Sequence, residues 1–70
     1  MQQLYAEIRQ SSKYAYQAEL CRQQGYGHPF KVRIEPAPDG YSVKGGYGGR
    51  YRIEDVDLFV IEGEAKVRLN

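Results

Sequence analysis

The sequence contains one cysteine, one histidine and no tryptophan in 70 residues. A single cysteine excludes an internal disulfide and a zinc site built from several thiolates. A chain without disulfides is typical of a reducing compartment. We therefore expect a cytoplasmic protein that holds no metal and no cofactor.

Long hydrophobic runs are also missing, and none approaches the roughly 18 apolar residues that a membrane-spanning helix requires. The N-terminal segment MQQLYAEIRQ lacks the basic region and the apolar stretch of a secretory signal. We expect neither a signal peptide nor a membrane contact.

The residues that are present supply enough apolar surface for one small domain over residues 1–70. Hydrophobic residues make up 41% of the chain and include seven tyrosines, which argues against disorder. A domain of this size buries roughly 60% of the surface that its unfolded chain exposes, so its stability is marginal. We therefore expect a protein partner or a second copy of the chain to add stability. So small a core also leaves little room for a deep catalytic pocket, which favours a non-enzymatic protein.

Glycine and proline divide the chain into two parts. Residues 1–24 contain neither, whereas residues 25–70 contain all eight glycines and all three prolines. This division predicts a mainly helical segment followed by a mainly stranded one. The clearest helix spans residues 13–24, with Ser12 capping its start and Gly25 ending it.

The segment before this helix has an ambiguous pattern. Leu4 and Ile8 fit an extension of the helical stripe back to residue 3, and we favour this interpretation. Together with Ala6, however, they alternate with Tyr5 and Glu7, which is also the pattern of a strand.

Alternating apolar and charged residues predict strands in the second half. The expected strands cover residues 30–35, 41–43, 51–53, 58–61 and 65–69. In this alternation, Tyr41 and Tyr51 are on the side of the sheet that faces the core, so we expect both to be structural. The sum is an α+β domain in which an N-terminal helix packs on a four- to five-stranded, mainly antiparallel sheet. So short a sheet can also curl into a small SH3-like or OB-like barrel.

Cys21 and His28 are the candidates for nucleophilic catalysis, because a nearby imidazole can activate a thiol. Cys21, however, lies on the apolar stripe of the predicted helix, where a free cysteine packs as a small hydrophobic residue. We favour the packing role and assign no catalytic residue.

The segment Gly45-Gly46-Tyr47-Gly48-Gly49 is the most unusual feature of the sequence. Bare backbone amides in such a loop can hold a phosphate, with Arg50 and Arg52 supplying charge. The segment matches neither the dinucleotide-binding glycine pattern nor the P-loop. We favour a hairpin loop or bulge that bends the sheet.

The net charge of +1 hides a segregated distribution, because residues 54–64 carry five acidic groups and no basic one. Basic residues alternate along the predicted strands and should point away from the core: Lys31, Arg33, Lys44, Arg50, Arg52, Lys66 and Arg68. Such a face, with Tyr47 nearby, can follow a nucleic-acid backbone. The alternative function is therefore a small RNA- or single-stranded-DNA-binding protein that uses Arg33, Lys44, Arg50, Arg52 and Arg68.

Tyrosines outside the core favour a protein partner instead, since they contribute large contact area at little entropic cost. Tyr5 and Tyr16 lie off the apolar stripe of the predicted helix. We predict a small non-enzymatic intracellular binding module, a protein-interaction subunit or adaptor. Its expected contact residues are Tyr5, Tyr16, Tyr47, Arg50 and Arg52.

Overall fold

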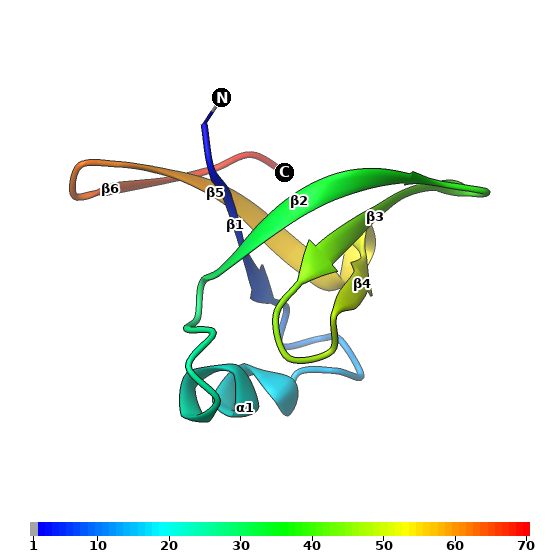
Figure 1. The fold of residues 1–70 in the computed structure, drawn as a ribbon, viewed down its shortest axis with the longest axis horizontal. Coiled ribbons are helices and arrows are strands. Elements are labelled where there is room, and N and C mark those ends of the chain that lie inside the picture. The colour runs from blue at the N-terminus through cyan, green and yellow to red at the C-terminus, as the bar shows by residue number, and fades with distance from the viewer. Residues whose placement is uncertain (1) are drawn as a thin grey trace.

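The computed structural model describes residues 2–70, which form six strands and one short α-helix. The strands are β1 (Leu4–Ile8), β2 (Phe30–Ala37), β3 (Gly40–Gly45), β4 (Arg50–Arg52), β5 (Val56–Glu62) and β6 (Ala65–Arg68). The helix α1 spans Gln17–Gln23, and a 3₁₀ turn, η1, spans Ile53–Asp55. All strand pairs are antiparallel, and the sheet order is β4-β3-β2-β1-β5-β6 (Figure 1).

The prediction of an N-terminal helix on four to five strands is wrong. Residues 4–8 form β1, which lies in the middle of the sheet between β2 and β5. Leu4 is opposite Val32 on one side and opposite Val60 on the other. Pairing along both edges stabilises the extended conformation of a segment whose local pattern is ambiguous.

The sheet is open, which contradicts the alternative of a closed SH3-like or OB-like barrel. Strands β4 and β6 form its two ends and do not pair with each other. Figure 1 shows the β2–β3 hairpin and the β5–β6 hairpin projecting in opposite directions, with α1 at the lower end of the molecule. The order of strands therefore leaves two free edges.

The helix is shorter at its start than the sequence predicts. The Ser12 hydroxyl accepts a hydrogen bond from the backbone N–H of Tyr14 at 3.0 Å, and so it closes a local turn. Turns continue to Tyr16, which precedes the first helical residue, Gln17, and gives it no side-chain cap. Residues 13–16 consequently approach the sheet as turns.

The helix ends where the sequence predicts. Gly25 has a φ of +86°, a left-handed conformation that glycine adopts without strain. The backbone N–H of Tyr26 donates to the carbonyl of Cys21 at 2.9 Å, and the N–H of Gly25 donates to the carbonyl of Arg22 at 3.3 Å. These two bonds form a Schellman motif, which satisfies the last carbonyls of α1.

The strands expected after residue 29 overlap β2 to β6, because turn residues separate them. Pro38 and Asp39 form the turn of the β2–β3 hairpin, and Gly63, at a φ of +59°, lies in the turn of the β5–β6 hairpin. The predicted run at residues 58–61 is buried as far as Val60, whereas Ile61 is partly exposed beyond it.

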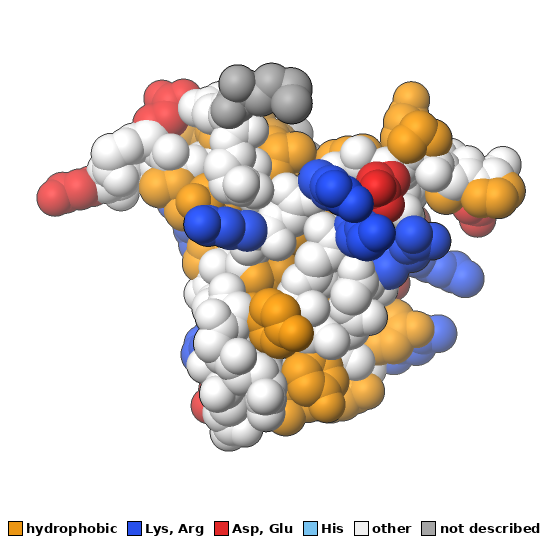
Figure 2. All heavy atoms as spheres, viewed as in Figure 1, with side chains coloured by type: hydrophobic (Ala, Val, Ile, Leu, Met, Phe, Trp, Pro, Cys, Tyr) orange, Lys and Arg blue, Asp and Glu red, His pale blue; other side chains and the backbone are white. Residues whose placement is uncertain are grey.

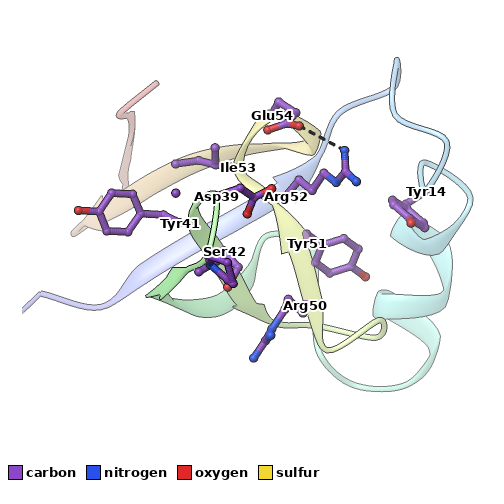
Figure 3. Close-up of a pocket in the computed structure, with 12 residues that line it drawn as sticks. Tyr14, Asp39, Tyr41, Ser42, Arg50, Tyr51, Arg52, Ile53 and Glu54 are labelled. Atoms are coloured by element: carbon purple, nitrogen blue, oxygen red, sulfur yellow. Dashed lines mark ion pairs between the residues drawn. The ribbon is translucent and has the colours of Figure 1, made fainter.

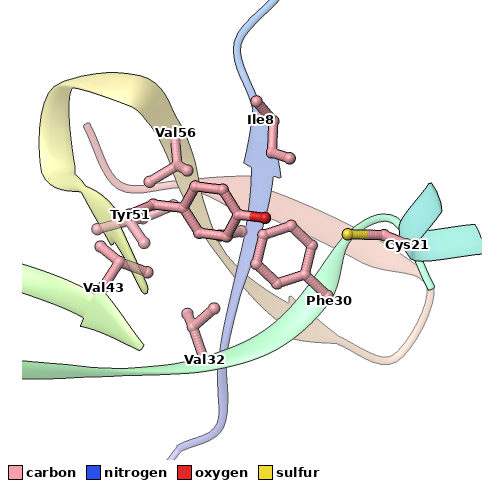
Figure 4. Close-up of a cluster of buried hydrophobic side chains, with 9 residues drawn as sticks. Ile8, Cys21, Phe30, Val32, Val43, Tyr51 and Val56 are labelled. Carbon is pink, nitrogen blue, oxygen red and sulfur yellow. The ribbon is translucent and has the colours of Figure 1, made fainter. Parts of the chain in front are cut away.

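One face of the sheet packs against α1 and carries the core (Figure 4). Phe30, Val43, Val56 and Cys21 are the largest fully buried side chains. The ring centroids of Phe30 and Tyr51 are 5.7 Å apart. Each large apolar side chain buried in this way contributes about 1.5–3 kcal/mol, so this face supplies most of the stability.

No helix among residues 2–70 is long and apolar enough to cross a membrane.

Candidate functional site

Cys21, the thiol considered as a candidate nucleophile, is not accessible. Cys21 is 0% exposed and belongs to the core cluster, so it packs as a small hydrophobic residue. His28 uses its Nε2 atom to accept a hydrogen bond from the backbone N–H of Ile8 at 2.9 Å. To act as a nucleophile pair, Cys21 would have to leave the core and His28 would have to break its hydrogen bond with Ile8.

The glycine-rich segment is the loop that joins β3 to β4, in agreement with the hairpin interpretation. Within it, the N–H of Gly45 donates to the Gly49 carbonyl at 2.9 Å, and the N–H of Gly49 donates to the Gly46 carbonyl at 3.3 Å. The N–H of Gly48 donates to the Tyr51 hydroxyl at 2.9 Å. Most of the amides that a phosphate would need are thus already used inside the loop.

Tyr51 links this loop to the start of α1. Its hydroxyl donates to Oε1 of Gln17 at 2.5 Å, while Nε2 of Gln17 donates to the Tyr16 hydroxyl at 3.2 Å. Burial raises the pKa of Tyr51 above its ordinary value of 10.0, so the hydroxyl keeps its proton and remains a donor. Tyr16, at 65% exposed, is the solvent end of this chain of hydrogen bonds.

The residues predicted to bind a partner do not form one surface. Tyr5 lies on β1 opposite Lys31 and Phe59, on the face of the sheet that points away from the core. Tyr16 is bonded through Gln17 to Tyr51 on the core side. The structure therefore separates Tyr5 from Tyr16.

The structure does bring together three of the basic residues. Arg33, Lys44 and Arg50 are cross-strand neighbours on β2, β3 and β4. All three surround Glu35, with nitrogen–oxygen distances of 3.2, 3.9 and 3.7 Å respectively. Figure 2 shows Lys and Arg side chains gathered around an acidic one over β2 and β3. This basic cluster keeps a surplus of positive charge.

Two other basic residues of the predicted face are held elsewhere. Arg68 lies on β6 at the far side of β1, where its Nη2 atom is 3.0 Å from Oδ1 of Asp57. Arg52 makes a 3.8 Å contact with Glu54. Both side chains are exposed, as the strand parity predicts, but Arg68 does not join the basic cluster.

A pocket of about 510 Å³ lies at the β4 edge of the sheet (Figure 3). We define the edge pocket by the residues that the argument below uses: Tyr41, Ser42, Arg50, Arg52 and Ile53. Tyr41 is 63% exposed and Ile53 is 37% exposed, so the pocket offers uncovered apolar surface. Figure 3 shows Arg52 reaching toward Glu54, with Tyr41 and Ile53 near the β2–β3 turn.

The hydroxyl of Ser42 has an unusual position in this pocket. Ser42 is only 8% exposed, and its Oγ atom has no hydrogen-bond partner among the described residues. The Oγ atom itself is closed off from solvent, so Ser42 packs against its neighbours and does not present its hydroxyl to a ligand in the pocket. The groups of the pocket that a ligand can reach are Tyr41, Ile53 and the two arginines.

Sequence reasoning missed Ser42, Tyr41 and Ile53. Tyr51 is buried, as expected from the alternation of side chains along its strand. The expectation that Tyr41 is also a core residue is wrong, because Tyr41 is 63% exposed. The β2–β3 hairpin extends beyond the part of the sheet that α1 covers, so Tyr41 shares the core parity without reaching the core. Its place next to the turn at Pro38 and Asp39 is the signal that distinguishes it from Tyr51.

Residues 2–70 contain no group of three or more His, Cys, Asp or Glu side chains that could hold a metal ion. Comparisons with protein-family models, with curated proteins and with solved structures find no match to this chain.

Proposed function

We propose that this chain is a non-enzymatic, intracellular protein-interaction module that binds an extended segment of a partner protein in the edge pocket. The observation that carries the proposal is the combination, in one pocket, of exposed apolar side chains and two exposed arginines. Such a mixture of an apolar centre and a polar rim is typical of surfaces that bind proteins.

The strand arrangement supports an extended partner. Strand β3 begins at Gly40, whereas its pairing with β4 stops at Ser42 and Arg52. The chain then turns into η1 and leaves the start of β3 at the edge of the sheet. An extended peptide can pair with such an edge and place alternate side chains into the adjoining pocket.

The side chains of the pocket can contact both the apolar side chains and the polar oxygens of such a peptide. Tyr41 and Ile53 can cover an apolar side chain of the partner, and interface tyrosines often contribute strongly to affinity. Arg50 and Arg52 can donate to carbonyl or carboxylate oxygens. The guanidinium groups of Arg50 and Arg52 are well exposed and free to adjust.

Selection of peptides from a displayed library on the immobilised protein tests this function. Peptides so selected should bind Tyr41→Ala at least about tenfold more weakly, because hot-spot truncations cost on the order of 2 kcal/mol. Tyr26→Ala is the matched control, since Tyr26 is 52% exposed and lies outside the pocket. Equal binding to both variants, or failure to select any peptide, would contradict the proposal.

The basic cluster supports a second candidate function, the binding of RNA or single-stranded DNA. Arg33, Lys44 and Arg50 share a single carboxylate, Glu35, and so retain positive charge that a phosphate backbone can neutralise. Titration of fluorescent oligonucleotides at low and moderate salt tests this candidate. Binding that is undetectable at low salt would eliminate it, since phosphate contacts strengthen steeply there.

A further inference from the structure

A second pocket, of about 760 Å³, lies between α1 and the end of β1 and is separate from the edge pocket. We call it the arginine pocket and define it by Arg9, Arg22, His28 and Arg68. These residues come from the end of β1, from α1, from the loop before β2 and from β6. Their side chains are thus brought together only by the fold.

The backbone of β1 fixes the proton position on His28. The N–H of Ile8 donates to Nε2 of His28, so Nε2 is an acceptor and carries no proton. A neutral imidazole with a bare Nε2 has its proton on Nδ1. His28 therefore presents an N–H donor on the side of the ring away from Ile8.

Arg22 faces this donor with another donor. Its Nη2 atom is 3.5 Å from Nδ1 of His28. A guanidinium has no acceptor, and Nδ1 in this tautomer has none either, so the two groups cannot bond to each other. An oxygen atom with free lone pairs could accept from both, which makes the Arg22–His28 pair half of a binding site.

Two further arginines supply the other half. Nε of Arg9 and Nη2 of Arg68 contact the same oxygen, Oδ1 of Asp57, at 2.9 and 3.0 Å. The shared carboxylate holds the two guanidinium groups close together and neutralises only one of them. The other nitrogen atoms of each guanidinium group can still donate hydrogen bonds to a ligand.

The other charges around the pocket leave this surplus in place. Glu7 lines the pocket, but Nζ of Lys66 contacts its Oε2 at 3.0 Å. Glu19 contacts Arg22 at 3.1 Å, and both side chains are more than half exposed, so that pair is weak. Four cations therefore meet three carboxylates around the pocket.

We propose that the arginine pocket binds a phosphate monoester group of a small molecule. Arg22, His28 and the Arg9–Arg68 pair line the same pocket, and a tetrahedral phosphate presents oxygens in several directions that can accept from donors on its different sides. The acceptor sites of a carboxylate lie in one plane, so it matches donors from separate elements less well. The proposal is independent of the peptide-binding function of the edge pocket.

Titration of the isotopically labelled full chain with inorganic phosphate, followed by NMR, tests the proposal. Experiments at constant pH above the pKa of free imidazole keep His28 neutral at the outset. We expect saturable shifts at the Nδ1 resonance of His28 and at the side chains of Arg9 and Arg22. Sulfate should compete, whereas acetate at the same ionic strength should not.

Three variants make this experiment decisive. Arg22→Gln should weaken phosphate binding about tenfold, the usual effect of losing a charge-assisted donor, and His28→Gln should weaken it by displacing the ring N–H. His28→Gln keeps an acceptor for the N–H of Ile8 and replaces the ring donor with a flexible amide donor, so it tests the position of the donor without loss of the contact to β1. Arg33→Gln, in the basic cluster, should leave the affinity unchanged.

The proposal is overturned by any of three results: shifts that rise linearly without saturation, equal affinity of Arg22→Gln and the parent chain, or an equal loss in Arg33→Gln. The first result would show no site, and the last would show binding to positive charge in general. None of them bears on binding at the edge pocket.

Discussion

The hydroxyl of Tyr51 donates a 2.5 Å hydrogen bond to Oε1 of Gln17 and accepts one from the N–H of Gly48. One buried side chain on β4 thereby fixes both the start of α1 and the β3–β4 loop. The two elements that it joins to the loop are short, since α1 has seven residues and β4 has three.

Tyr51→Phe should therefore destabilise the protein although it removes only one atom. The substitution leaves the Gln17 carbonyl and the Gly48 amide without their partner, at a cost of about 1–3 kcal/mol. Urea denaturation measures the change in the free energy of unfolding. Tyr41→Phe is the control, and it should have almost no effect because Tyr41 is largely exposed. Equal stabilities of the two variants would contradict the linking role of Tyr51.

Gly46 is expected to be much harder to replace than Gly49, although both lie in the β3–β4 loop. A Cβ atom at this position would lie 2.7–2.8 Å from the ring of Phe30, which is only 1% exposed. Gly46→Ala should cost about 1–3 kcal/mol more than Gly49→Ala, since overpacking adds to backbone strain. The two glycines have φ values of +72° and +80°, so the strain is matched, and a Cβ on Gly49 meets nothing within 4 Å. Thermal unfolding of the two variants would show the difference, and similar melting temperatures would refute it.

The stability of the protein should fall as the pH drops below 6.5 because of His28. Burial lowers the pKa of His28 from its ordinary 6.5, with Arg22 and Lys66 lowering it further and Glu7 opposing them. The unfolded chain then binds a proton at a higher pH than the folded protein does. Stability is therefore complete above 6.5 and declines as the pH falls from there toward the folded-state pKa.

His28→Gln removes this titration and keeps an acceptor for the N–H of Ile8. Its free energy of unfolding should depend less on pH over that window than that of the parent chain. Carboxylates contribute to acid sensitivity in both proteins, so the difference between the two curves isolates His28. Parallel curves would mean that His28 makes no contribution.

Cys21 should react slowly with iodoacetamide in the native protein. Its side chain is 0% exposed, so alkylation must wait for local or global opening of the core. We expect the rate in urea to exceed the native rate by on the order of a hundredfold or more. Mass spectrometry measures the extent of alkylation over time. Fast alkylation of the native protein would contradict the burial of Cys21 and would support a thiol-based activity.

The strands of the second half could be predicted because turn residues mark their ends. Pro38, Asp39 and Gly63 separate segments whose alternation is otherwise clear, and Gly25 marks the end of α1 in the same way. These signals are local, and neighbouring residues are enough to specify them.

The position of β1 could not be predicted in this way. The alternation of Leu4, Ala6 and Ile8 fits a strand, but Leu4 and Ile8 alone also fit a helical stripe, and the segment has no glycine or proline to decide between them. What decides is pairing with β2 and β5, which are remote in the chain. The candidate sites depend on the same remote contacts, because Ser42 and His28 have informative neighbours only after the sheet has formed.

The central place of β1 has a consequence for synthesis on the ribosome. Strand β1 is translated before both of its neighbours in the sheet, β2 and β5. The growing chain consequently carries an incompletely paired middle strand until β5 has left the exit tunnel, when long-range pairing can close the sheet. A nascent chain stalled before β5 has emerged would expose one edge of β1 to chaperones or to other chains.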